Sequence, residues 1–189
     1  MSTASSTASR RHFLRSTSGV AATALLVGAT TGCQGESMNK PHPPLASLDE
    51  AMRELERLAQ APALVSHAAW TWPQTLDHCA QSIEYSLSGF PQPKSALFQR
   101  TLGAAAFSVF AWRGRMTHDL AEPIPGAPPL GASDGAVALA RLRNAVQAFQ
   151  ASTAPLQPHF AYGVLSKAEY DHAHAMHLAN HFSAFALPA

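Results

Sequence analysis

The chain has 189 residues and a formal net charge of +1, and charged residues make up only 13% of it, well below the usual quarter. The first 33 residues contain three arginines and no acidic residue, so the remaining 156 residues hold 10 basic and 12 acidic side chains, a net charge of −2. This balance excludes the basic stripe that nucleic-acid binding needs. The length after position 33 suits one domain with one hydrophobic core. Abundant Ala and scarce β-branched runs favour helix over sheet.

The N-terminus has the pattern of an export signal. Residues 9–15 read SRRHFLR, and a short apolar stretch, GVAATALLV, follows at residues 19–27. This stretch is too short for a permanent membrane anchor, and the Gly and Thr within it and the Ser beside it dilute it too much for a packed helix. The pattern looks like the twin-arginine signal, with Arg15 in place of the final Lys. That route generally handles proteins that fold before export, often with a cofactor already loaded.

Residues 30–33, TTGC, resemble a lipobox in which Cys33 becomes acylated and forms the mature N-terminus. Thr30 stands where a lipobox usually has Leu. We therefore expect residues 1–33 to be a twin-arginine signal peptide and the mature protein to be periplasmic or a lipoprotein anchored to the membrane through Cys33. The second cysteine, Cys79, lies near the apolar side of its helix and is expected to be a small buried residue.

Residues 34–46 are polar and Pro-rich, as a linker should be, and residues 47–189 are expected to form the domain. Apolar periodicity, N-caps and Pro-rich breaks predict an all-α fold with no strand of any conviction. The first helix should begin at the cap Ser47, with Glu50 three residues on, and the second near Pro73, ending about Leu87. The later expected elements are a helix at 95–116, a loop at 121–131, a helix at 133–150 capped by Ser133, and a last helix from the cap Ser166 to about Phe185.

Histidine is the unusual residue, with ten in the chain. The last predicted helix carries four of them, and His177 and His181 are one helical turn apart, so both imidazoles can reach one ion from the same face. His174 lies on that face too, whereas His172 points to the opposite side. A third ligand has to come from another helix, and His78 lies on the small polar face of the second helix.

Other interpretations of these histidines remain open. A His pair four residues apart also occurs as a solvated face or as packed, hydrogen-bonded side chains, and His172 is expected to be solvated. No C-x-x-C-H motif for haem attachment occurs, although ligation of haem by two histidines stays open. No G-x-S-x-G motif occurs, so serine hydrolase chemistry has no support.

Two blocks resemble a known family. TWPQTLDHCAQSIEYSLSGFP (Thr71–Pro91) and HFAYGVLSKAEYDHAHAMHLANHFSAF (His159–Phe185) look like an uncharacterised branch of the DinB-like proteins. That branch has a His-containing second helix, a downstream H-P-F-F-G-x-L-S segment and a final H-x-x-H-H-L helix. The resemblance covers about residues 48–185 and implies a DinB-like antiparallel four-helix bundle, with an extra helix or long loops.

The same resemblance implies a divalent metal, zinc or nickel, bound by His78, His177 and His181. The sequence departs from the pattern where Phe160 follows His159 and where Asn180 replaces the first His of the final pair, which puts a supporting role of that position in doubt. The candidates for such supporting roles near the metal are Tyr85, Glu84 and His174.

Three neutral imidazoles leave coordination positions open, as in catalytic zinc sites. Such an ion lowers the pKa of a bound water or thiol. Together with the resemblance, this suggests a metal-dependent thiol transferase or hydrolase with a small thiol or other small molecule as substrate. The alternative is a non-catalytic envelope lipoprotein that binds a metal or a partner, and the sequence does not decide whether the protein is an enzyme. It does not indicate the oligomeric state either, and a dimer fits as well as a monomer.

Overall fold

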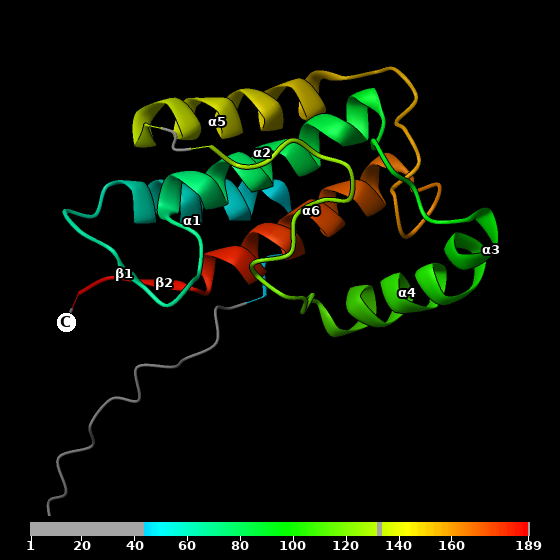
Figure 1. The fold of residues 1–189 in the computed structure, drawn as a ribbon, viewed down its shortest axis with the longest axis horizontal. Helices are drawn as coiled ribbons and strands as arrows, with labels where there is room; N and C mark the ends of the chain where they lie inside the picture. Colours follow the sequence, from blue (N-terminus) through cyan, green and yellow to red (C-terminus); the bar gives the residue numbers. More distant parts are fainter. Residues whose placement is uncertain (1–43, 132–133, 189) are drawn as a thin grey trace, which may run out of the picture. The chain divides into compact units, whose positions relative to one another are not determined.

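The computed structural model describes residues 44–131 and 134–188. The predicted signal, Cys33 and most of the predicted linker therefore lie outside the described residues. The elements in chain order (Figure 1) are α1 (Leu48–Ala59), β1 (Val65–Ser66), α2 (Trp72–Ser88), α3 (Ala96–Phe98), the π-helical segment η1 (Gln99–Gly103), α4 (Ala104–Arg113), α5 (Gly135–Ala151), α6 (Lys167–Phe182) and β2 (Phe185–Ala186).

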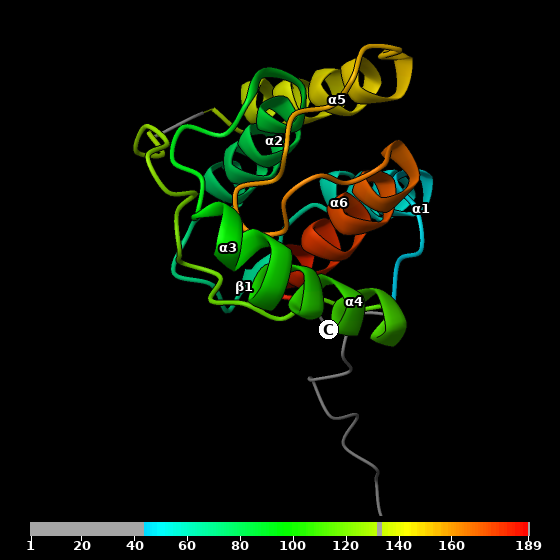
Figure 2. The same ribbon diagram turned by 90° about the vertical axis from the view of Figure 1, so that its right-hand side faces the viewer.

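The four long helices α1, α2, α5 and α6 pack on one another. Helix α2 contacts α5 along much of its length, and α6 contacts both α1 and α2. Figure 2 shows α2 beside α5 and α6 beside α1. Their inward faces bury one apolar core, to which α1 contributes Leu48, Ala51, Leu55 and Leu58. The predicted all-α class is confirmed.

Three helices begin where the sequence predicts. The Ser47 hydroxyl accepts the N–H of Glu50 at the start of α1, and Pro73 stands in the first turn of α2. At α6, Ser166 and Glu169 form a reciprocal capping box. Each cap satisfies an N–H that has no partner inside its own helix, which is why these short motifs define helix starts well.

The helix predicted at 95–116 runs from Ala96 to Arg113 and contains a π-helical segment. It consists of α3, η1 and α4, and its C-cap is Gly114, whose φ is 63°. At Gly103, where η1 meets α4, a Cβ atom would lie 1.9 Å from the carbonyl oxygen of Ala161. The glycine therefore permits a close backbone approach between two segments. The π-helical segment η1 ends at this glycine, and such segments occur mostly as single turns inside α-helices.

Two other predicted helices are present, but one end of each differs by a few residues from the prediction. Helix α5 begins at Gly135, and its cap is Asp134, whose Oδ1 accepts the N–H groups of Ala136 and Val137. The predicted cap, Ser133, lies outside the described residues. Helix α6 ends at Phe182, because the chain then extends as β2 and pairs antiparallel with β1. A two-residue ladder depends on tertiary contact rather than on local sequence, so the prediction of no strand was wrong as well.

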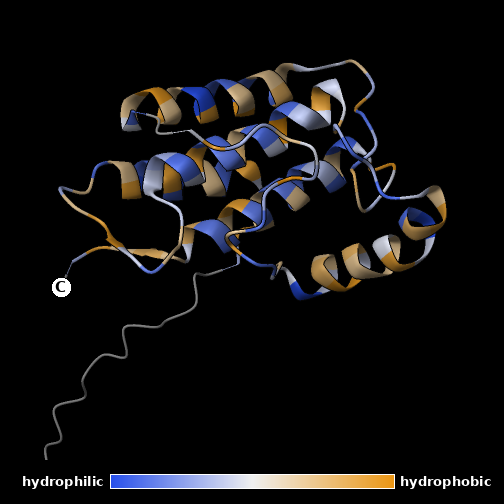
Figure 3. Ribbon diagram, viewed as in Figure 1, coloured by the Kyte–Doolittle hydropathy of each residue, from blue (hydrophilic) through white to orange (hydrophobic). Residues whose placement is uncertain are grey.

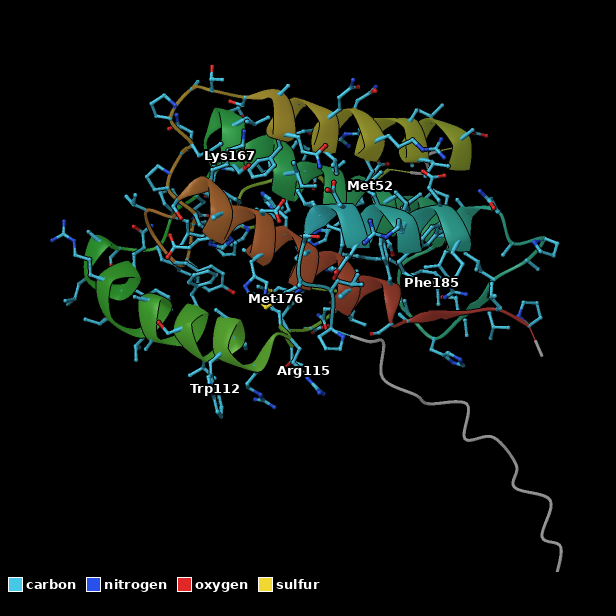
Figure 4. The ribbon with its side chains drawn as sticks, turned by 180° about the vertical axis from the view of Figure 1, so that it is seen from behind. Met52, Trp112, Arg115, Lys167, Met176 and Phe185 are labelled. Carbon is cyan, nitrogen blue, oxygen red and sulfur yellow. The ribbon has the colours of Figure 1, made fainter. Side chains whose placement is uncertain are left out.

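The segment α3–η1–α4 lies outside the four long helices and contacts α6. It carries exposed apolar side chains, among them Leu102, Val109 and Trp112, and its hydrophobic residues are visible in Figure 3. In Figure 4, Trp112 projects away from the protein, whereas Met176 of α6 lies inside it. No helix among the described residues is both long and apolar enough to cross a membrane.

The chain from Gly114 to Asp134 connects α4 to α5 without helix in its described residues, as predicted for 121–131. In Figure 1 this yellow-green segment returns from α4 towards α5 across α6 and α2. Two side chains of those helices hold its backbone: Asn180 donates to the carbonyl of His118, and Gln81 donates to the carbonyl of Pro128. The loop therefore forms a wall over the histidine-bearing faces of α2 and α6.

Candidate metal centre

Helices α2 and α6 bring together His78, His177 and His181, the three residues predicted as ligands and here named the histidine triad. One potential ligand atom from each of the three lies within 4.8 Å of those of the other two. The Nε2 atoms of His78 and His177 are 3.2 Å apart. Two nitrogens bound about 2.0–2.1 Å from one tetrahedral ion lie about 3.3–3.4 Å apart. That pair therefore already has the spacing of two ligands of one ion.

The sequence produces this convergence in two steps. His177 and His181 stand one turn apart on α6, so their rings lie side by side, with centroids 4.7 Å apart. The packing of α2 against α6 then brings in His78, whose ring centroid is 4.6 Å from that of His181 and 5.1 Å from that of His177. The first step is local, and the second exists only in the folded chain.

Burial keeps the triad uncharged. Desolvation lowers the pKa of His78 to about 4, with a smaller contribution from His118, and it lowers the pKa of His181 to about 2. The pKa of His177 is lowered by its burial and by the neighbouring histidines. Neutral imidazole is the form that binds metal, so the site holds its side chains ready as ligands at neutral pH.

Each ring of the triad also has a buried nitrogen without a hydrogen-bond partner among the described residues: Nδ1 of His78, Nδ1 of His177 and Nε2 of His181. Buried polar atoms in folded proteins are nearly always paired with protein, water or an ion. Because an ion between the rings would take the facing Nε2 atoms of His78 and His177, the unpartnered Nδ1 atoms of those two rings would point away from it, and Nε2 of His181 is the unpartnered atom that fits a group bound there. Three imidazoles are a donor set suited to zinc, nickel or copper.

A fourth histidine, His118 of the loop after α4, lies beside the histidine triad. Its ring centroid is 5.2 Å from that of His177 and 4.9 Å from that of His181. Sequence reasoning missed it, since a lone histidine in a loop has no spacing pattern, and the high histidine count was the only signal. Asn180, where the sequence departs from the DinB-like pattern, donates to the His118 carbonyl.

Trp70, just before α2, covers another side of the triad. Its ring stacks on His181 with a centroid distance of 6.0 Å and an interplanar angle of 6°, and it lies 4.8 Å from the ring of His78. An indole over two imidazoles limits the access of water, and that contributes to the desolvation of both rings. Trp70 was not among the predicted site residues.

A cavity of about 160 Å³ opens beside the triad. Its walls come from α2, α6, the loop after α4 and the turn before α6, and the residues that matter here are His78, Ser82, His118, His159, His174 and His177. A cavity of about 150 Å³ is enough for a benzene-sized molecule. The triad thus borders a space that accommodates a small ligand.

Hydrogen bonds fix the tautomers of the two cavity histidines outside the triad. The N–H groups of Ala161 and Tyr162 donate to His159 Nδ1, so the proton of His159 sits on Nε2. The Ser86 hydroxyl donates to the Ile83 carbonyl, so it must accept from His174, whose proton also sits on Nε2. Burial lowers the pKa of both histidines to about 3.

The candidates for supporting roles lie in different places. His174 lines the cavity, as its position on the helix face suggested. Glu84 instead forms a bidentate ion pair with Arg141 of α5, and the ring of Tyr85 packs on Phe90, with centroids 5.7 Å apart. Neither Glu84 nor Tyr85 lines the cavity. Cys79 is a buried free thiol, as expected.

Residues 40–187 match the model of a family described as "Protein of unknown function (DUF1569)". The chain belongs to this family. The DUF1569 match contains the whole histidine triad, His118 and every residue of the cavity wall. No curated protein and no solved structure matches the chain.

Proposed function

We propose that this DUF1569 protein binds a divalent transition metal, zinc or nickel, through the histidine triad. The observation that carries the proposal is the convergence of three buried, neutral imidazoles from two helices, with potential ligand atoms within 4.8 Å of one another. The unpartnered Nε2 of His181 supports it. Without a bound group, this buried nitrogen would stay unsatisfied at a free-energy cost.

We further propose that the fold is related to the DinB-like four-helix proteins. The support is the placement of the triad: one histidine on the second long helix and a pair, four residues apart, on the last helix. The segment α3–η1–α4 would then be the extra element of this branch.

We propose metal-assisted chemistry on a small thiol, or hydrolysis, as the activity. A bound divalent ion lowers the pKa of a thiol or water that it holds. The chain's own residues would bind and orient the substrate in the cavity beside His78 and His177. There His159 and His174 are held in single tautomers, so each has a defined donor and acceptor side, and both stay neutral because burial lowers their pKa.

The proposal is tested by loading the metal-free protein with Co²⁺ and titrating it with a small thiol. We expect one Co²⁺ per chain and a thiolate-to-cobalt charge-transfer band that grows with thiol and is absent from His78→Ala. Less than stoichiometric metal would overturn the metal site. A full complement of metal with no thiol band and no turnover of thiol-dependent substrates would favour a second candidate, a non-catalytic metal-binding protein, to which the fourth histidine near the triad also lends support.

We also propose that the protein is exported and anchored to the membrane by a lipid on Cys33. The support is SRRHFLR, the short apolar stretch and TTGC, all of which precede the family match at residue 40. A targeting segment is expected outside the folded domain.

A further inference from the structure

We propose that His118 is a fourth imidazole ligand of the metal, supplied by the loop between α4 and α5. The inference rests on the proposed metal site of the triad and adds to it a residue from outside the helices that carry the triad.

The tautomer of His118 is the one that a ligand needs. Its Nδ1 lies 2.8 Å from the carbonyl oxygen of Asp119. A carbonyl can only accept, so Nδ1 carries the proton and Nε2 of the neutral ring keeps its lone pair. Metal-bound histidines are commonly oriented in this way, by an N–H donated to a backbone carbonyl on the side away from the ion.

The free lone pair of His118 is directed into buried space. Its Nε2 is buried and has no hydrogen-bond partner among the described residues, although the rest of the residue is half-buried. The ring centroid distances to His177 and His181 are 5.2 Å and 4.9 Å, close to the 4.6–5.1 Å found within the triad. The His118 ring therefore lies beside the triad, although its nitrogens are not among the potential ligand atoms that all lie within 4.8 Å of one another, so coordination by His118 requires a shift of the ring towards the triad.

The loop is also held so that this ring stays at the site. Asn180, one residue before His181, donates to the His118 carbonyl over 3.5 Å, and Gln81 of α2 holds the loop further on at Pro128. Both anchors come from the two helices that carry the triad. A residue that merely walled the cavity would not need a fixed tautomer with an unpaired acceptor.

A fourth imidazole changes what the metal can do. Four nitrogens complete a tetrahedral shell around zinc, and catalytic zinc can expand to five ligands. The thiol of the proposed function would then enter as a fifth ligand or displace His118. Removal of the His118 ring should accordingly weaken metal binding while making the metal more accessible to added small ligands.

The test is to count imidazoles on Zn²⁺ in the wild-type protein by X-ray absorption spectroscopy, and to measure Zn²⁺ affinity by chelator competition. We expect four imidazoles in the wild type and three in His118→Ala, with Zn²⁺ affinity lowered by more than about 100-fold, since loss of a ligand exceeds the 10–100-fold effect of residues that only support a metal site. Added imidazole should restore the four-nitrogen shell of His118→Ala. His67→Ala, which removes an exposed histidine, is the matched control and should keep both values.

The outcomes separate the two proposals. A wild-type protein that holds no Zn²⁺ overturns the metal site itself. A wild-type protein that holds Zn²⁺ with three imidazoles and an oxygen ligand overturns only the role of His118, and this count does not depend on whether the variant folds. Unchanged affinity in His118→Ala, with no response to imidazole, overturns it as well.

Discussion

The Nε2 atoms of His78 and His177 lie 3.2 Å apart, although 99 positions of sequence separate the two residues. Helices α2 and α6 must pack in one register for this contact to exist, because a slide by one turn would move the rings about 5.4 Å. The histidine triad and the helix packing therefore depend on each other, because His78 and His177 both lie in the interface between α2 and α6.

Removal of any one imidazole of the triad should release the metal. We expect His78→Ala, His177→Ala and His181→Ala each to lose more than about 100-fold in Zn²⁺ affinity, since ligand loss exceeds the 10–100-fold effect of supporting residues. His174→Ala should keep its metal, because His174 Nε2 binds Ser86 rather than the triad, and His172→Ala should be neutral. Elemental analysis after dialysis measures this, and full occupancy in His78→Ala would contradict the triad.

The hydroxyl of Ser86 should stabilise the fold through His174. It accepts the His174 N–H at 3.2 Å inside the protein, so Ser86→Ala leaves a buried donor unpaired, at a cost of about 1–3 kcal/mol in the free energy of unfolding. Ser88→Ala is the matched control: its hydroxyl also donates to a carbonyl of α2 but is exposed, and its effect should stay within about 0.5 kcal/mol. Urea unfolding of the metal-free proteins compares the two, and equal effects would contradict the role of His174.

Gly103 should not tolerate a side chain. A Cβ there would lie 1.9 Å from the Ala161 carbonyl oxygen. Gly103→Ala therefore forces the backbone to move and should lower the free energy of unfolding by about 3 kcal/mol or more. Nothing lies within 4 Å of a Cβ at Gly131, so Gly131→Ala should change stability by no more than about 0.5 kcal/mol. Denaturant midpoints of the two variants make the comparison, and a Gly103→Ala protein as stable as the wild type would show that the two segments separate easily.

The metal-free domain should lose stability in acid. Burial lowers the pKa of His78 to about 4 and those of His159 and His174 to about 3, whereas an unfolded histidine titrates near 6.5. Between about pH 6.5 and these lower values the unfolded chain binds more protons than the folded one, so the free energy of unfolding falls as the pH falls. Each such histidine contributes at most about 2 kcal/mol between pH 7 and pH 5.

Urea unfolding of the metal-free protein at pH 7, 6 and 5 measures this loss. His174→Asn should reduce the pH dependence by up to one proton, about 1.4 kcal/mol per pH unit, whereas His67→Ala should leave it unchanged because His67 is exposed. Stability that does not vary with pH would mean that these histidines are more hydrated than their burial indicates.

Export should depend on the twin arginines, and attachment to the membrane should depend on Cys33. Arg10→Lys combined with Arg11→Lys should leave the protein in the cytoplasm, and Cys33→Ser should leave it exported but soluble. Cell fractionation with an antibody to the folded domain measures both. Unchanged export of the double variant would exclude the twin-arginine route, and a membrane-bound Cys33→Ser protein would exclude lipidation.

Local chemistry in the sequence determined much of this protein. The caps at Ser47 and Ser166, the Pro at position 73 and the non-helical residues 121–131 depend on neighbours within a few positions. The pairing of His177 with His181 depends only on the helical period. For that reason these features could be predicted, as could the all-α class.

Other features were decided only by the tertiary structure. The close approach of Gly103 to the Ala161 carbonyl and the β1–β2 ladder join segments that are distant in the sequence, about 120 residues apart in the ladder. Glu84 shared the second helix with His78, yet Arg141 of α5 takes its carboxylate. His118 reaches the triad because a loop without periodicity is held across α2 and α6 by Gln81 and Asn180. Contacts of this kind join distant segments through backbone and side-chain geometry, which no local pattern encodes.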